Sequence, residues 1–116
     1  MLIDLKTRIA NIQHDIRCVT ASLAAREIKE NNGLLVDVRE PGEVENKPVE
    51  AAINIPRGVL EMKMAEKITD PQHPIYLHCA SGMRAKLAAE QLLNMGYENV
   101  TVVTCPIEQI NQANGE

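Results

Sequence analysis

The sequence predicts an α/β fold with three layers, in which a mainly parallel sheet carries helices on both faces. Short apolar runs alternate along the chain with amphipathic segments of helical length, and Gly, Pro and Asn clusters separate them. Residues 34–38 (Leu-Leu-Val-Asp-Val) form a short apolar run after a turn signal, as expected for a strand buried in a parallel sheet. With 116 residues, 45% of them hydrophobic, the chain is long enough for a single core.

We expect residues 1–17 to form an amphipathic helix that precedes a domain at 18–116. Apolar side chains recur in this segment at spacings of three and four, a heptad-like stripe made of Leu2, Leu5, Ile9, Ile12 and Ile16. The stripe either packs on the chain's own domain or forms the seam of a homodimer through residues 2–16.

The first half of the domain is expected to alternate strands with helices. A short strand at 16–19 precedes a helix that Thr20 or Ser22 can cap and that Asn31-Asn32-Gly33 ends. The strand at 34–38 leads to a turn. The polar, proline-interrupted residues 43–50 then favour a loop with about one helical turn. A brief strand is expected at 52–55.

The second half repeats the alternation. Apolar residues at helical spacing predict a helix at 59–68, which Asp70-Pro71 breaks before a strand at 75–78. An amphipathic helix is expected from Arg84 to Gly96. The β-branched run at 100–103 predicts the last strand, and a short terminal helix is expected at 107–113.

One cysteine, Cys79, lies between the 75–78 strand and the helix that follows. Unpaired backbone N–H groups and the positive end of the helix dipole converge there, which favours a thiolate over a thiol. The same N–H groups can hold an anionic substrate beside the sulfur. Because open α/β sheets bind ligands at the carboxyl ends of their strands, we predict nucleophilic chemistry at Cys79, against the alternative of an inert core thiol.

Composition argues against several function classes. Twelve basic against 16 acidic residues, with two aromatic side chains, do not favour nucleic-acid binding. The sequence contains no stretch of 18 apolar residues, so no membrane span is predicted. The charged N-terminal turns do not resemble a secretory signal. Three widely spaced cysteines do not form a disulfide framework or a metal site. We therefore expect a reduced, cytoplasmic protein without a metal or another cofactor.

Four segments occur in an order and spacing that resemble one family. They are 35–40 (Leu-Val-Asp-Val-Arg-Glu), 52–61 (Ala-Ile-Asn-Ile-Pro-Arg-Gly-Val-Leu-Glu), 76–85 (Tyr-Leu-His-Cys-Ala-Ser-Gly-Met-Arg-Ala) and 96–100 (Gly-Tyr-Glu-Asn-Val). Together they resemble the single-domain rhodanese (sulfurtransferase) proteins over about residues 18–103.

The resemblance implies a rhodanese-like fold and a catalytic role for Cys79. This cysteine would accept a sulfane sulfur from thiosulfate or a persulfide donor and pass it to a thiol or a protein cysteine. The substrate would be bound by the loop that follows, whose residues are Ala80, Ser81, Gly82, Met83 and Arg84. An alternative from another class is a non-enzymatic persulfide carrier or protein-interaction module.

The length of that loop separates two chemistries. Four residues intervene between Cys79 and Arg84, whereas cysteine-dependent phosphatases of related fold have five. The shorter loop resembles the sulfur-transferring branch, so dephosphorylation or arsenate reduction is disfavoured.

Two segments depart from the family pattern. Residues 47–51 (Lys-Pro-Val-Glu-Ala) replace a Gly-His-Ile-x-Gly segment, and Cys105-Pro106 and Ile110 replace a Gly-Gly pair and a tryptophan. We expect both segments beside the active loop, where they would change the shape of the pocket and the efficiency of catalysis.

The remaining candidate residues are expected to be mainly structural. Asp37 and Arg39 would tie loops together at a strand end, and His78 would point to the opposite side of its strand from Cys79. Cys18 and Cys105 are expected to be inert thiols. The alternative for Cys105 is a resolving thiol that takes the persulfide or forms a disulfide with Cys79.

Overall fold

A five-stranded parallel sheet is the centre of the computed structural model, which describes residues 1–115. The strand order is β1-β5-β4-β2-β3, and every neighbouring pair is parallel. The strands are β1 (Arg17–Val19), β2 (Leu34–Asp37), β3 (Ile53–Asn54), β4 (Ile75–His78) and β5 (Val100–Val103). The helices are α1 (Leu5–Ala10), α2 (Ala21–Asn31), α3 (Pro41–Asn46), the 3-10 turn η1 (Arg57–Val59), α4 (Leu60–Lys67), α5 (Met83–Met95) and α6 (Ile107–Ala113). The predicted fold class is confirmed.

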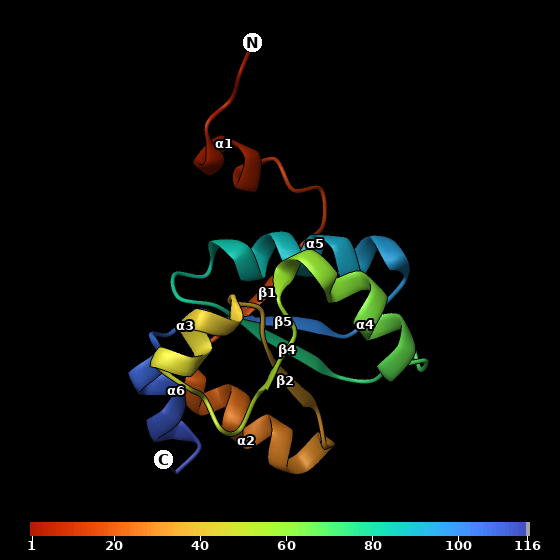
Figure 1. Ribbon diagram of the computed structural model, residues 1–116. Coiled ribbons are helices and arrows are strands. Elements are labelled where there is room, and N and C mark those ends of the chain that lie inside the picture. The colour runs from red at the N-terminus through yellow and green to blue at the C-terminus, as the bar shows by residue number, and fades with distance from the viewer. Residues whose placement is uncertain (116) are drawn as a thin grey trace.

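Helices cover both faces of the sheet (Figure 1): α4 and α5 lie on one face, and α2 and α6 on the other. Each face has its own hydrophobic cluster, made mainly of aliphatic side chains. The first includes Val36, Leu60, Met64, Leu77, Cys79, Ala88, Leu92 and Val102. The second includes Val19, Ala24, Leu35, Tyr76, Val103, Ile107 and Ile110. Buried aliphatic side chains on both sides of the strands account for the nearly continuous apolar runs in the sequence.

The helix expected at 1–17 is wrong in extent. Helix α1 spans only Leu5–Ala10 and begins at Asp4, whose side chain accepts a hydrogen bond from the Thr7 N–H (2.8 Å). Residues Arg17–Val19 are extended because they pair with β5. Periodicity alone did not show that the heptad-like stripe begins before the helix and continues past its end, up to the start of β1. Figure 1 places α1 beyond the outer side of α5, where Arg8 pairs with Glu90 (2.6 Å).

Several element ends differ from the prediction by a few residues. Polar residues in the region of the expected loop form the six-residue helix α3, which starts with Pro41 at its first position and has a capping box between Glu40 and Glu43. Asn32, in the left-handed conformation, ends α2, and Gly96 ends α5, as predicted.

Within residues 1–115, none of the helices is long and apolar enough to cross a membrane.

The topology places the end of β4 in the middle of the sheet. β4 pairs with β2 on one side and with β5 on the other, so that Asp37 lies opposite His78 and Leu77 lies opposite Val102. Cys79 follows β4 directly. The loops after β2, β4 and β5 therefore meet at one edge of the sheet.

Candidate active site

The Cys79 sulfur lies inside the turn that connects β4 to α5. Its residue is 1% exposed, and Sγ accepts hydrogen bonds from the backbone N–H groups of Gly82 (3.0 Å) and Ala85 (3.4 Å). Both donors lie at the start of α5, where backbone N–H groups have no partner within the helix. The turn therefore directs two backbone N–H groups at the sulfur.

Gly82 makes this turn sterically possible. It lies just before α5 with φ +90°, in the left-handed region that side chains rarely adopt. A Cβ at this position would meet only the Thr104 methyl group at 4.0 Å. The backbone angle, rather than lack of space, is what requires glycine here.

The other predicted loop residues form the outer rim. Ala80, Ser81 and Met83 are exposed, and the sulfur receives its hydrogen bonds from the backbone rather than from the Ser81 hydroxyl. Arg84, on the first turn of α5, is partly buried. The prediction that these residues contact a substrate stays a prediction.

A buried ion pair anchors the adjoining turn after β2. Arg39 and Asp37 are 3% and 1% exposed, and the guanidinium contacts the carboxylate through Nη2 (2.7 Å) and Nε (3.0 and 3.1 Å). Arg39 also donates to the carbonyl oxygens of Glu43 (3.4 Å) and Lys47 (2.7 Å), which spans helix α3. The expectation that Asp37 and Arg39 tie loops together is confirmed.

His78 is buried next to this pair. Its Nε2 lies 3.9 Å from Oδ2 of Asp37, and neither ring nitrogen has a hydrogen-bond partner among the described residues. Burial lowers the pKa of His78, and Arg39 lowers it further, whereas Asp37 acts in the opposite direction. The ring is therefore neutral at neutral pH and packs as part of the protein interior.

Glu43 was not predicted as a site residue from the sequence. Its carboxylate makes two contacts with the Arg84 guanidinium, at 2.6 Å and 2.9 Å, and links α3 to the start of α5. The hydrogen bonds from Arg84 lower the pKa of the Glu43 carboxyl to about 2. A clue was present in the sequence, because Glu43 lies in the turn after β2, which meets the turn after β4 at the same sheet edge.

A pocket of about 270 Å³ opens beside the loop. Its lining includes Ala80 of the loop and the charged residues Arg39, Glu43, Lys47 and Glu108, together with Asn46, Pro106 and Ile107. Lys47 and Pro106 belong to the two segments that depart from the family pattern. The expectation that these segments lie beside the active loop is confirmed for Lys47 and Pro106, whereas Val49 and Ile110 are buried in the cluster on the α2 and α6 face.

The other two cysteines lie apart from this turn. Cys18 is exposed on β1. Cys105 packs against the core cluster on the α2 and α6 face, whereas Cys79 belongs to the cluster on the α4 and α5 face. The two thiols thus belong to hydrophobic clusters on different faces of the sheet, and both are free. The resolving role considered for Cys105 stays a hypothesis.

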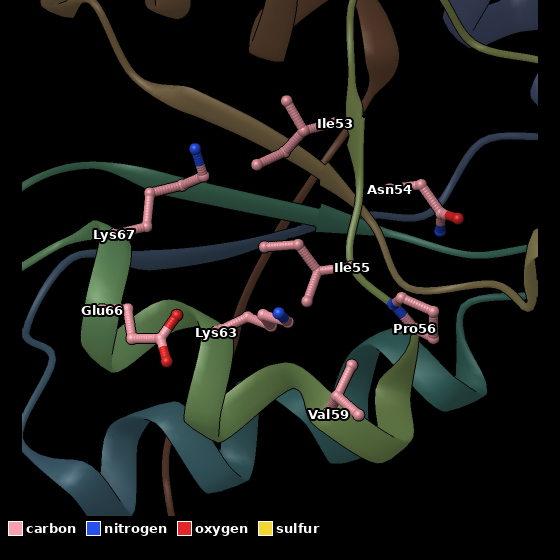
Figure 2. A pocket seen from close by; sticks show the side chains of 8 residues that line it. All are labelled: Ile53, Asn54, Ile55, Pro56, Val59, Lys63, Glu66 and Lys67. Carbon is pink, nitrogen blue, oxygen red and sulfur yellow. The ribbon is translucent and has the colours of Figure 1, made fainter.

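A second pocket, of about 640 Å³, lies between the edge strand β3 and helix α4. Figure 2 shows its aliphatic side chains from the β3 segment facing the polar side chains of α4. Its lining residues are Ile53, Asn54, Ile55, Pro56, Val59, Lys63, Glu66 and Lys67, so it includes no residue of the 79–84 turn.

Comparison with known proteins gives a consistent result. A family model described as a rhodanese-like domain matches residues 20–113. Thiosulfate sulfurtransferase RDL2, mitochondrial, from Saccharomyces cerevisiae is 41% identical over 81 residues, which cover 60% of this chain and 54% of that protein. The match to a putative mitochondrial thiosulfate sulfurtransferase from Schizosaccharomyces pombe, 29% identical over 92 residues, covers 63% of that relative's length. The chain thus spans less than two thirds of these curated relatives.

Solved structures agree with the observed fold. The crystal structure of the single-domain sulfurtransferase RDL2 from S. cerevisiae superposes with a TM-score of 0.64 at 27% identity, covering 89% of this chain and 94% of that one. The solution structure of a polysulfide-sulfur transferase homodimer from Wolinella succinogenes has a TM-score of 0.71 at 25% identity, covering 90% and 79%.

Proposed function

Because the chain belongs to the rhodanese-like domain family, we propose that it is a sulfurtransferase in which Cys79 carries the sulfur as a persulfide. The observation that supports this most directly is the position of the Cys79 sulfur. It accepts two backbone N–H hydrogen bonds within the turn at the carboxyl end of β4. Relatives named thiosulfate sulfurtransferase support thiosulfate as a donor.

In the first step, the Cys79 thiolate attacks the outer sulfur of thiosulfate. A new S–S bond forms at Cys79, the S–S bond of thiosulfate breaks, and sulfite leaves with the electron pair. The negative charge that was on the thiolate is now on the outer sulfur of the persulfide. Backbone N–H groups of the turn, including those of Gly82 and Ala85, supply hydrogen bonds that favour this anion without reorganisation of water.

In the second step, a thiophilic acceptor attacks the outer sulfur of the persulfide. With cyanide as acceptor, thiocyanate leaves and the Cys79 thiolate is restored. In the cell, we propose a thiol or a protein cysteine as acceptor. Ala80, Ser81 and Met83, which are exposed around the sulfur, form the rim that donor and acceptor reach first. Three free cysteines fit a reducing compartment such as the cytoplasm.

Steady-state kinetics with thiosulfate and cyanide test this proposal. Because each half-reaction is complete before the next begins, double-reciprocal plots at several cyanide concentrations should be parallel. Intersecting lines would mean that donor and acceptor bind together, and the covalent persulfide route would be wrong. Thiocyanate formation no faster than in buffer would instead favour the carrier or interaction module.

A further inference from the structure

Arg84 is the cation nearest in sequence to the active turn, yet it already has an anionic partner. Two N–H groups of its guanidinium contact the two carboxylate oxygens of Glu43, at 2.6 Å and 2.9 Å. This bidentate arrangement uses the donor geometry that would otherwise suit a sulfonate or another planar anion. A small anion that approaches Arg84 therefore meets an occupied site.

Glu43 is held in this position from its own side. Its Oε1 also accepts the Glu40 N–H (3.3 Å) in the capping box of α3. The buried Arg39 fixes α3 by donating to the carbonyl oxygens of Glu43 and Lys47. The carboxylate thus faces Arg84 from an anchored helix, which gives it a high effective concentration at the guanidinium.

The other charges around the neighbouring pocket are also paired. Arg39 pairs with Asp37, and Lys47 contacts Glu108 at 3.0 Å. Among the residues that line the 270 Å³ pocket, each basic side chain therefore has a carboxylate partner within the described chain. The Arg84–Glu43 pair can open at low cost, because both side chains are more than a third exposed and exposed pairs contribute little to stability.

We infer that Glu43 is a specificity-determining residue that competes with anionic sulfur donors for Arg84. This inference rests on the proposed function, since it concerns the donors of the sulfurtransferase. A dianion such as thiosulfate gains the paired Nη1 and Nη2 contacts of Arg84 only by displacing the Glu43 carboxylate. A donor without a negative group next to Arg84 does not compete with Glu43. Glu43 thereby makes the site less favourable for small dianionic donors.

The test uses two thiol reagents that differ in one charge. Iodoacetate and iodoacetamide each alkylate a thiolate and release iodide, but only iodoacetate carries a carboxylate. The rate constants at Cys79 are measured by peptide mass spectrometry in wild type and in Glu43→Gln, which keeps the acceptor for Glu40 N–H. Glu90→Gln is the matched control, because Glu90 forms a similar bidentate pair with Arg8 at 3.2 Å and 2.6 Å.

Glu43→Gln should raise the iodoacetate-to-iodoacetamide rate ratio at Cys79 by about three- to tenfold, and Glu90→Gln should leave it unchanged. In turnover assays, Glu43→Gln should lower the KM for thiosulfate by a similar factor with kcat nearly constant. An unchanged ratio, or an equal rise in both variants, would overturn the inference. A shifted ratio in a protein that transfers no sulfur would uphold the role of Glu43 and refute the proposed function instead.

A double-mutant cycle shows whether Glu43 acts through Arg84. In an Arg84→Gln background, Glu43→Gln should change the rate ratio by less than half as much, because the competition has been removed. The same change in both backgrounds would mean that Glu43 only repels anions, and the competition for Arg84 would be refuted.

Discussion

Cys79 and Cys105 lie at equivalent places on opposite sides of the same sheet. Cys79 follows β4 directly, and Cys105 lies two residues beyond the neighbouring strand β5. Each sulfur accepts a backbone N–H from the start of a helix: Gly82 donates to Cys79 at 3.0 Å, and Ala21 donates to Cys105 at 3.2 Å. A thiol next to a helix N-terminus therefore occurs twice in this chain.

The difference lies in what surrounds each sulfur. The Cys79 turn curls round its own sulfur, so that a second N–H, from Ala85, also points to it. Cys105 takes its hydrogen bond from a helix distant in sequence, and it lines a pocket of about 530 Å³ between α2 and α6. Since one N–H and a helix terminus are common to both, we infer that the enclosing turn is what distinguishes Cys79, the proposed nucleophile, from Cys105.

The largest expected effect compares the two thiols directly. Cys79→Ser should lower thiocyanate formation at least about a thousandfold, because the proposed nucleophile is lost. Cys105→Ser should stay within about twofold of wild type. Turnover of both purified variants, with melting curves to show that they are folded, checks this. Comparable losses in the two variants would show that the turn around Cys79 does not distinguish it from Cys105.

The next effect concerns the buried Asp37–Arg39 ion pair, which anchors the turn after β2 beside Cys79. Asp37→Asn should lower the free energy of unfolding by about 3–5 kcal/mol, because it leaves the buried Arg39 charge without its partner. Glu61→Gln, which opens the more exposed Arg57–Glu61 pair, is the control and should cost less than about 1 kcal/mol. Urea unfolding measures both. A cost for Asp37→Asn as small as that of the control would mean that the pair does not anchor this region.

A smaller effect separates the role of the Cys79 turn in turnover from the cost of backbone strain at a glycine with positive φ. Gly82 and Gly96 both have positive φ, +90° and +105°, but only Gly82 donates to the Cys79 sulfur. Alanine at either position should destabilise the fold by a similar amount, on the order of 1–2 kcal/mol. Only Gly82→Ala should also lower kcat, by about 10- to 100-fold. Equal kcat values in the two variants would show that turn geometry does not matter for turnover.

The smallest effect is a pH dependence. His78 precedes Cys79, and its pKa is lowered below 6.5 in the folded state, mainly by burial. The unfolded chain therefore binds the proton first as pH falls. Stability from the neutral ring is complete above about pH 6.5 and decreases below it, by at most about 1.4 kcal/mol per pH unit.

Urea unfolding between pH 7.5 and 5.5 measures this slope, and His78→Gln should flatten it. A slope that is unchanged in His78→Gln would assign the titration to another group. The carboxyl of Glu43, with a pKa of about 2, does not affect the slope between pH 7.5 and 5.5. Its stabilisation of the fold is present above the unfolded pKa and is lost only as pH falls below that value.

The strands and the Cys79 turn could be predicted because their signals are local. The segments 75–78 and 100–103 are continuous apolar runs that become strands with the same bounds. Gly82 and Gly96 occur where the backbone needs positive φ. These properties depend on neighbouring residues in sequence, so pattern and position were sufficient.

Two features depended on tertiary structure and could not be predicted in the same way. The stripe at 2–16 continues through positions where Asp4 caps a helix and Arg17 joins a sheet. The pairing of Glu43 with Arg84 joins side chains 41 positions apart, and it depends on how α3 is anchored by Arg39. The strand order indicates that the regions of Glu43 and Arg84 meet, but charge and spacing along the chain do not identify the two side chains that pair.

The most direct test of the central claim is the intact mass of the reduced protein after incubation with thiosulfate and removal of the reagent. We predict a gain of one sulfur atom in wild type and in Cys105→Ser, reversed by cyanide and absent in Cys79→Ser. A gain that persists in Cys79→Ser, or is lost in Cys105→Ser, would contradict the assignment of the sulfur to Cys79. No gain in folded wild-type protein whose Cys79 can still be alkylated would contradict thiosulfate as the donor.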